Sequence, residues 1–116
     1  MRQILRELNE STGIAGSMVI TPDGIMVAAA LEKDRDEDTL AAFAASLLVS
    51  MKRGLAKLRA KSGLNSCTLV GTQGKLVFYD MDNSYLVVVA DADTSLAASA
   101  DAIDRAVFEI TNRRVA

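Results

Sequence analysis

The chain has 116 residues, of which 50% are hydrophobic and 24% are charged. This composition is typical of a folded globular protein, and the length predicts a single domain over residues 1–116. A net charge of −2, 4% aromatic residues and no Trp argue against nucleic acid as a partner, because phosphate binding needs a basic surface and base stacking needs aromatic rings.

The N-terminal third of the chain predicts a helix followed by a β-hairpin. Apolar residues at helical spacing indicate a first helix over residues 2–10, and Gly13 is expected to end it. Two apolar segments, residues 14–20 and 25–31, flank the sequence TPDG. Pro22 presets a turn and Gly24 accepts a positive φ, so these two segments are expected to pair.

The rest of the chain predicts a long helix, three strands and a final helix. After the charged segment 32–38, Asp38 or a neighbouring aspartate can cap a helix that runs to about residue 60. Strands are expected over residues 65–70, 75–80 and 85–90, and their short connections force antiparallel pairing. Apolar residues at helical spacing then indicate a last helix over residues 95–112.

The predicted strands are apolar at both odd and even positions. A sheet built from such strands needs cover on both faces. The long middle helix is the natural cover for one face, and the terminal helices can share the other. The sequence therefore predicts an α/β (α+β) fold, in the order α-β-β-α-β-β-β-α, with a five-stranded, mainly antiparallel sheet in a three-layer sandwich.

The middle helix has two apolar sides of different character. A stripe of large side chains is expected to cover the sheet: Leu40, Phe43, Leu47, Met51, Leu55 and Leu58. The far side carries small side chains: Ala42, Ala45, Ser46, Val49 and Ala56. Exposed alanines can serve simply as good helix formers, but a solvated helix face normally carries charges. Because the chain has no fourth helix, we expect these small residues to pack against a second copy about a two-fold axis.

No membrane segment is expected. The apolar run over residues 39–51 is shorter than the roughly 20 residues that a spanning helix needs, and charged segments flank it. The first ten residues carry charges throughout and lack the apolar region of a signal peptide, so a cytoplasmic location is expected.

Several of these features together resemble the Roadblock/dynein light chain family. They are the eight-element order, the GIAG sequence after the first helix, the TPDG hairpin, the Ala-rich middle helix and the turn VGTQGK after the third strand. The chain is most similar to the bacterial and archaeal branch, whose members often accompany Ras-like GTPases. The resemblance covers nearly the whole chain and implies a profilin- or longin-like fold.

The resemblance also implies an assembly and a role. Family members are homodimers in which the middle helices pack side by side and the third strands pair into one continuous sheet. The strand residues that would form this contact here are Ser66, Cys67, Thr68, Leu69 and Val70. The family acts as a non-catalytic platform, and some members bind a small GTPase and promote the hydrolysis of GTP by that GTPase.

The residues themselves argue against an enzyme. The chain has no His, so the commonest general base and metal ligand are missing, and no metal or cofactor is expected. Cys67 has no His to activate it and is expected to pack as a small apolar residue. The segment 71–75 departs from the phosphate-loop pattern and leads into a strand, so a hairpin turn is expected there.

A basic cluster occupies the second half of the middle helix: Lys52, Arg53, Lys57, Arg59 and Lys61. One interpretation is stabilisation of the helix C-terminus by its macrodipole. The other is that Lys52, Arg53 and Lys57 form the rim of a partner-binding site that steers an acidic surface.

Two classes of function fit the sequence. The first is a homodimeric adaptor or regulator of a Ras-like small GTPase. The second is a ligand-sensing or scaffold domain of similar layering in a signalling or motility complex, which would need a pocket with several converging polar groups.

Overall fold

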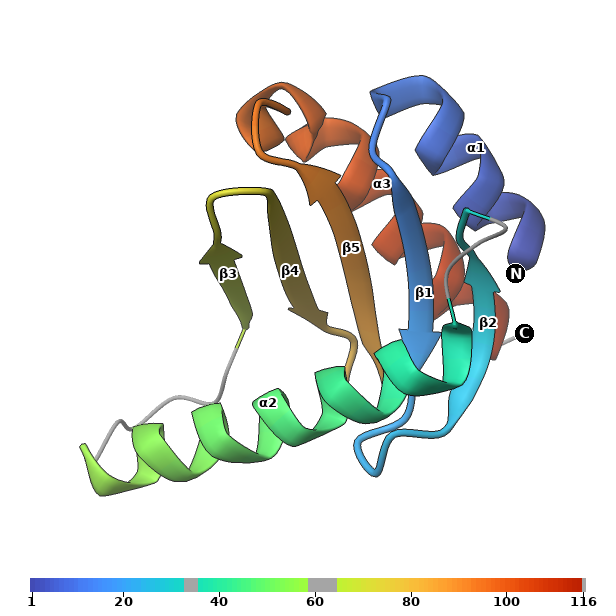
Figure 1. The fold of residues 1–116 in the computed structure, drawn as a ribbon. Helices are drawn as coiled ribbons and strands as arrows, with labels where there is room; N and C mark the ends of the chain where they lie inside the picture. Colours follow the sequence, from blue (N-terminus) through green and yellow to red (C-terminus); the bar gives the residue numbers. More distant parts are fainter. Residues whose placement is uncertain (33–35, 59–64, 116) are drawn as a thin grey trace.

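The computed structural model describes residues 1–32, 36–58 and 65–115, with only the backbone for 113–115 (Figure 1). The predicted order of helices and strands is confirmed. The elements are α1 (Arg2–Thr12), β1 (Gly16–Ile20), β2 (Met26–Ala30), α2 (Glu37–Lys57), β3 (Ser66–Val70), β4 (Gly74–Asp80), β5 (Tyr85–Asp91) and α3 (Leu96–Val115).

Local signals in the sequence set the ends of these elements. Gly13 ends α1 in the left-handed region, with φ of 73°, and its N–H donates to the Asn9 carbonyl at 2.9 Å. Gly24 has φ of 92° in the β1–β2 turn, as TPDG predicts. The cap of α2 is Asp36, whose carboxylate accepts from the Thr39 N–H at 3.2 Å and the Thr39 hydroxyl at 2.8 Å.

The five strands form one sheet in the order β2-β1-β5-β4-β3, and every neighbouring pair is antiparallel. The central strands β1 and β5 are buried along almost their whole length, because both of their faces are covered. The outer strands β2 and β3 are the two edges of the sheet.

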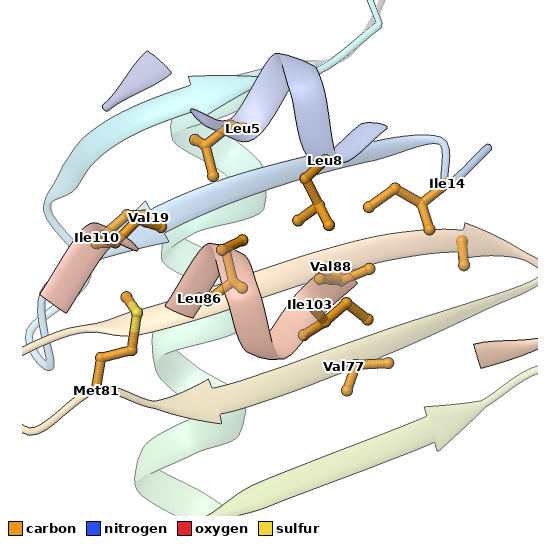
Figure 2. Packing of buried hydrophobic residues seen from close by; sticks show 12 residues of the cluster. Leu5, Leu8, Ile14, Val19, Val77, Met81, Leu86, Val88, Ile103 and Ile110 are labelled. Carbon is orange, nitrogen blue, oxygen red and sulfur yellow. The ribbon is translucent and has the colours of Figure 1, made fainter. Parts of the chain in front are cut away.

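Helices cover the two faces as predicted. Figure 2 shows one core, in which Leu5 and Leu8 of α1 and Ile103 and Ile110 of α3 meet the strands. The strand residues on that face are Val19, Val77, Leu86, Val88 and Ala90. On the other face α2 packs against Met18, Ile20, Ala29, Phe78, Tyr85 and Val87. The three-layer sandwich is therefore built around two separate cores.

The side of α2 that covers the sheet differs from the prediction. Its fully buried residues are Ala41, Ala44 and Leu48, whereas Phe43 is 56% exposed and Leu58 is 80% exposed. The small alanines allow the helix backbone to lie close to the sheet, which rotates the large stripe partly out of the core. Leu40, Leu47 and Met51 pack at the border of the core, and Leu55 is half-buried. The prediction was wrong for Phe43 and Leu58.

The direction of α2 leaves part of this face open. Figure 1 shows α2 running across the strands from β2 toward β3 and projecting beyond β3. With 21 residues, α2 is about 31 Å long, whereas four strand spacings make the sheet only about 19 Å wide. The last two turns of α2 therefore extend past the edge of the sheet.

Candidate functional site

The candidate site is the surface formed by α2 and the edge strand β3. By length and hydropathy, α2 is the one helix among the described residues that matches a membrane span. Helices that cover a sheet in globular proteins meet the same test, and α2 packs Ala41, Ala44 and Leu48 on the sheet. Its apolar residues outside that contact are exposed or half-buried in the protomer.

The small residues of α2 lie on the side that faces the β1–β2 turn. Ala42, Ser46 and Val49 are exposed, and Val49 is 49% accessible. Ala45 is half-buried because the β1–β2 turn lies close to it. The approach is so close that a methyl group added at Gly24 would lie only 2.8 Å from the Cβ of Ala45. The close approach of the turn thus gives a reason within one protomer for a small residue at position 45. That these residues contact a second copy stays a prediction.

Strand β3 is the least covered strand of the sheet. Ser66, Thr68, Leu69 and Val70 are exposed, and Val70 is 72% accessible. The pairing of Cys67 with Phe78 puts its side chain on the α2 face, where it borders the core as a half-buried free thiol. An apolar edge strand with unpaired backbone groups is a template for another strand.

A groove separates α2 from the turn between β3 and β4. Its apolar lining comes from Phe43 of α2, Leu69 of β3, Leu76 of β4 and Val89 of β5, and its volume is about 330 Å³. Gln73, Lys75 and Asp91 also line it. This groove could not be expected from the sequence, because the helical periodicity of α2 placed Phe43 against the sheet.

The basic residues of α2 divide into two kinds. The ammonium of Lys52 lies 4.8 Å from the centroid of the buried Tyr85 ring, which is a cation–π contact within the protomer. Arg53 and Lys57 are exposed on the outer surface of the helix. Arg59 and Lys61 lie outside the described residues. All three predicted partner-binding residues are exposed, and Lys52 also contacts the Tyr85 ring.

The segment 71–74 forms a turn between strands, as expected. The Gly71 N–H donates to the Gly74 carbonyl at 2.8 Å, and the chain continues directly into β4. The ammonium of Lys75 donates to the carbonyl of Thr94 at 2.7 Å. Within the described part of the chain, no three His, Cys, Asp or Glu side chains are grouped as a metal site requires.

Among the described residues, two titratable side chains have shifted pKa values: Asp36 at the N-cap of α2 and Tyr79 on β4. Hydrogen bonds from the Thr39 hydroxyl and N–H lower the pKa of Asp36, since they stabilise the carboxylate. Burial, and then the negative charge of Asp104, raise the pKa of Tyr79. Both shifts have structural causes at a helix cap and at the border of the α3 core.

Comparisons with known proteins bear on the family and the fold. The family model of the Roadblock/LC7 domain matches residues 2–90. An uncharacterized protein of Methanocaldococcus jannaschii is 31% identical over 93% of this chain and 91% of its own length. A second uncharacterized protein of the same organism is also 31% identical, over 93% of this chain and 94% of its own length.

Solved structures agree with this result. A Roadblock/LC7 domain from Streptomyces avermitilis matches with a TM-score of 0.90 and 12% identity, covering 100% of this chain and 98% of the other. MglB of Myxococcus xanthus matches with a TM-score of 0.86 and 23% identity, covering 96% and 91%. Profilin II of Acanthamoeba castellanii, with a TM-score of 0.66 and 10% identity over 97% of both chains, confirms the profilin-like layering.

At these low identities the solved structures show the fold alone, whereas the family model and the M. jannaschii proteins decide the family. The model covers most of the chain, and the identity of 31% extends over 93% of it. The resemblance inferred from the sequence is confirmed, and the chain belongs to the Roadblock/LC7 domain family.

Proposed function

We propose that this protein is a non-catalytic homodimeric regulator that binds a Ras-like small GTPase and modulates its GTP hydrolysis. The observation that carries the proposal is the open edge of β3, which is exposed and apolar and lies beside the exposed part of α2. Membership of the Roadblock/LC7 family supports the role of a platform.

The geometry of an edge strand supports a specific arrangement for the proposed dimer. When two copies of β3 pair antiparallel, the two-fold axis stands perpendicular to the sheet. Both α2 helices then lie on the same face of a ten-stranded sheet and run antiparallel. The proposed contact residues on β3 are Ser66, Cys67, Thr68, Leu69 and Val70. On α2 the sequence proposes Ala42, Ala45, Ser46 and Val49.

The GTPase would bind the outer surface of the paired helices. Arg53 and Lys57 are exposed there and would occur twice in the dimer. Two basic patches of this kind can steer an acidic surface and accelerate its association. Ras-like GTPases present switch segments that partners reorder, so a rigid pair of helices is a suitable platform for them.

The assembly is tested by sedimentation of the purified protein. We expect a dimer at micromolar concentration, and we expect the thiol of Cys67 to react slowly with a thiol reagent because β3 is paired. Dilution to the monomer should restore fast reaction. A protein that stays monomeric at high concentration would remove the structural basis of the proposal.

The partner is tested by pull-down with nucleotide-loaded Ras-like GTPases, followed by association kinetics over a salt series. The double variant Arg53→Glu with Lys57→Glu should remain dimeric and bind the GTPase more slowly, with a weaker salt dependence. The control is Arg6→Glu with Arg105→Glu, which makes the same charge change at exposed residues of α1 and α3. Equal association rates for both double variants would place the binding surface elsewhere.

The groove beside Phe43 gives the ligand-sensing alternative a structural argument, since its lining includes Gln73, Lys75 and Asp91. That role requires a small molecule to enter the groove in the assembled protein. Calorimetric titration of the dimer with candidate metabolites distinguishes this function from GTPase regulation.

A further inference from the structure

Contacts among the described residues do not explain one residue of α2. Gly54 lies inside the helix, where glycine costs about 1 kcal/mol relative to alanine. Its φ is not positive, and a methyl group added there would meet nothing within 4 Å outside its own helix. Neither its backbone conformation nor packing against the described residues therefore requires glycine at this position.

Gly54 lies on the side of α2 that carries the exposed large apolar residues. At about 100° per residue it is about 20° around the helix from Phe43 and about 40° from Leu58. Val49, on the side with small residues, is about 140° away by the same count. Phe43 is 56% exposed, Leu58 is 80% exposed, and the groove lies directly beside Phe43.

The two-fold axis of the proposed dimer selects this side of α2. Residues Ala45 and Lys52 show that the other side faces the β1–β2 and β4–β5 turns, through Gly24 and Tyr85. The side with Phe43 faces the β3–β4 turn, at the opposite end of the strands. Because the two-fold rotation reverses the strand direction, the partner's helix lies at that opposite end, over the groove.

The length of α2 places the crossing point near Gly54. The sheet is about 19 Å wide, which α2 spans in roughly 13 residues, so the helix passes the edge of β3 near residue 50. The two-fold axis lies half a strand spacing beyond β3, midway between the two paired copies of this strand. The two helices therefore meet along the last two turns of α2, where Gly54 points toward the partner.

We infer that Gly54 is the close-contact point of the two α2 helices, and that the side of α2 with Phe43, Gly54 and Leu58 makes the helical part of the dimer. The occupant of the groove is a second copy of this chain, which contributes the last two turns of its α2. The inference rests on the proposed dimer. It replaces the helix contact proposed from the sequence, because Ala42, Ala45, Ser46 and Val49 then lie outside the contact. The exposed Ala42, Ser46 and Val49 remain beside Arg53 and available to the GTPase.

The test compares two large substitutions on opposite sides of one turn. Gly54→Leu should raise the dimer dissociation constant about 100-fold or more, because one overpacked contact occurs twice across the two-fold axis. Ala56→Leu is the matched control, since Ala56 is exposed on the other side of α2, and it should change the dissociation constant by less than about threefold. Sedimentation over a concentration series measures both constants.

A milder substitution gives effects of opposite sign on folding and on association. Gly54→Ala improves helix propensity, so an isolated protomer carrying it should unfold at a higher temperature. In a protein whose β3 strand is unchanged, Gly54→Ala should weaken the dimer. Circular dichroism at a concentration where the protein is monomeric measures the first effect, and sedimentation measures the second.

The outcomes separate this inference from the proposed function. A Gly54→Leu protein that dimerises like wild type, while substitutions in β3 dissociate it, overturns the inference and leaves the β3 dimer in place. Dissociation by Ala56→Leu and not by Gly54→Leu overturns it as well, because the side with small residues would then make the contact. A monomeric wild-type protein overturns both proposals.

Discussion

The two edges of the sheet differ in how they are protected. Along β2, side chains of α1 donate to two backbone carbonyls: Arg2 Nε donates to Ala29 at 3.2 Å and Asn9 Nδ2 donates to Ala30 at 2.8 Å. The pairing of β1 with β2 also shifts register between Val19 and Ile20, which marks a β-bulge. Capped carbonyls and a bulge are both devices that prevent an edge from pairing with another strand.

The edge at β3 has none of these devices in the described part of the chain. Its five residues pair in regular register with β4, from Ser66 opposite Tyr79 to Val70 opposite Lys75, and no strand pairs with its outer side. The residues of β3 are uncharged, so charge does not protect the edge either. This difference between the two edges supports the proposal that β3 is the edge that pairs with a second copy.

The largest expected effect comes from charging the open edge. Leu69→Lys with Val70→Lys should raise the dimer dissociation constant about 100-fold or more, because pairing would bury or juxtapose four added charges. The protomer should still fold, since both residues are exposed. Sedimentation measures the change. The matched control at the other edge is Ile25→Lys with Val27→Lys, also exposed residues, which should leave the dimer intact.

The next effect concerns the turn that leads into the protected edge. Gly24→Ala should lower the free energy of unfolding by about 2–3 kcal/mol, because the φ of 92° is unfavourable for alanine and the new methyl group would lie 2.8 Å from Ala45 Cβ. Gly13→Ala is the control for the φ effect alone, since Gly13 has open space around it, and should cost about 1–2 kcal/mol. Urea denaturation measures both. If Gly24→Ala and Gly13→Ala lowered the free energy of unfolding equally, the contact between this turn and Ala45 of α2 would not contribute to the effect.

A smaller effect is expected from removing the Asn9 side chain, which donates to a carbonyl of β2. Asn9→Ala deletes the donor to the Ala30 carbonyl and the acceptor of the buried Ser17 hydroxyl, which lies 2.8 Å away. The free energy of unfolding should fall by about 1–2 kcal/mol. With the edge uncapped, the variant should also self-associate beyond a dimer, which light scattering detects. Gln3→Ala, on the exposed side of α1, should do neither.

The smallest effect tests the cap of α2 and its pH dependence. The pKa of Asp36 is lower in the folded protein than in the unfolded chain, so its carboxylate stabilises the fold above the ordinary aspartate pKa. That contribution is lost as the pH falls through the lowered folded-state value. Wild type should therefore exceed Asp36→Ala in stability at neutral pH, and the difference should shrink below about pH 4. Acid denaturation followed by circular dichroism tests this, and a constant difference would contradict it.

The sequence alone determined the order of elements, the antiparallel pairing and the covering of both faces. These features depend on local causes: glycines at 13 and 24 that accept positive φ, short connections between strands, and strands apolar on both sides. That β3 is an edge strand was implied by the resemblance to the Roadblock family, and the strand order confirms it.

Only the tertiary structure decided which way α2 is rotated and where it ends relative to the sheet. The periodicity placed Phe43 and Leu58 on the sheet, but Ala41 and Ala44 allow a closer approach, and the turn at Gly24 fixes Ala45 on the other side. A helical wheel gives the angles between side chains and not the angle to the sheet. That angle depends on backbone distances between elements remote in the sequence, and it decides which residues of α2 are available to a second copy.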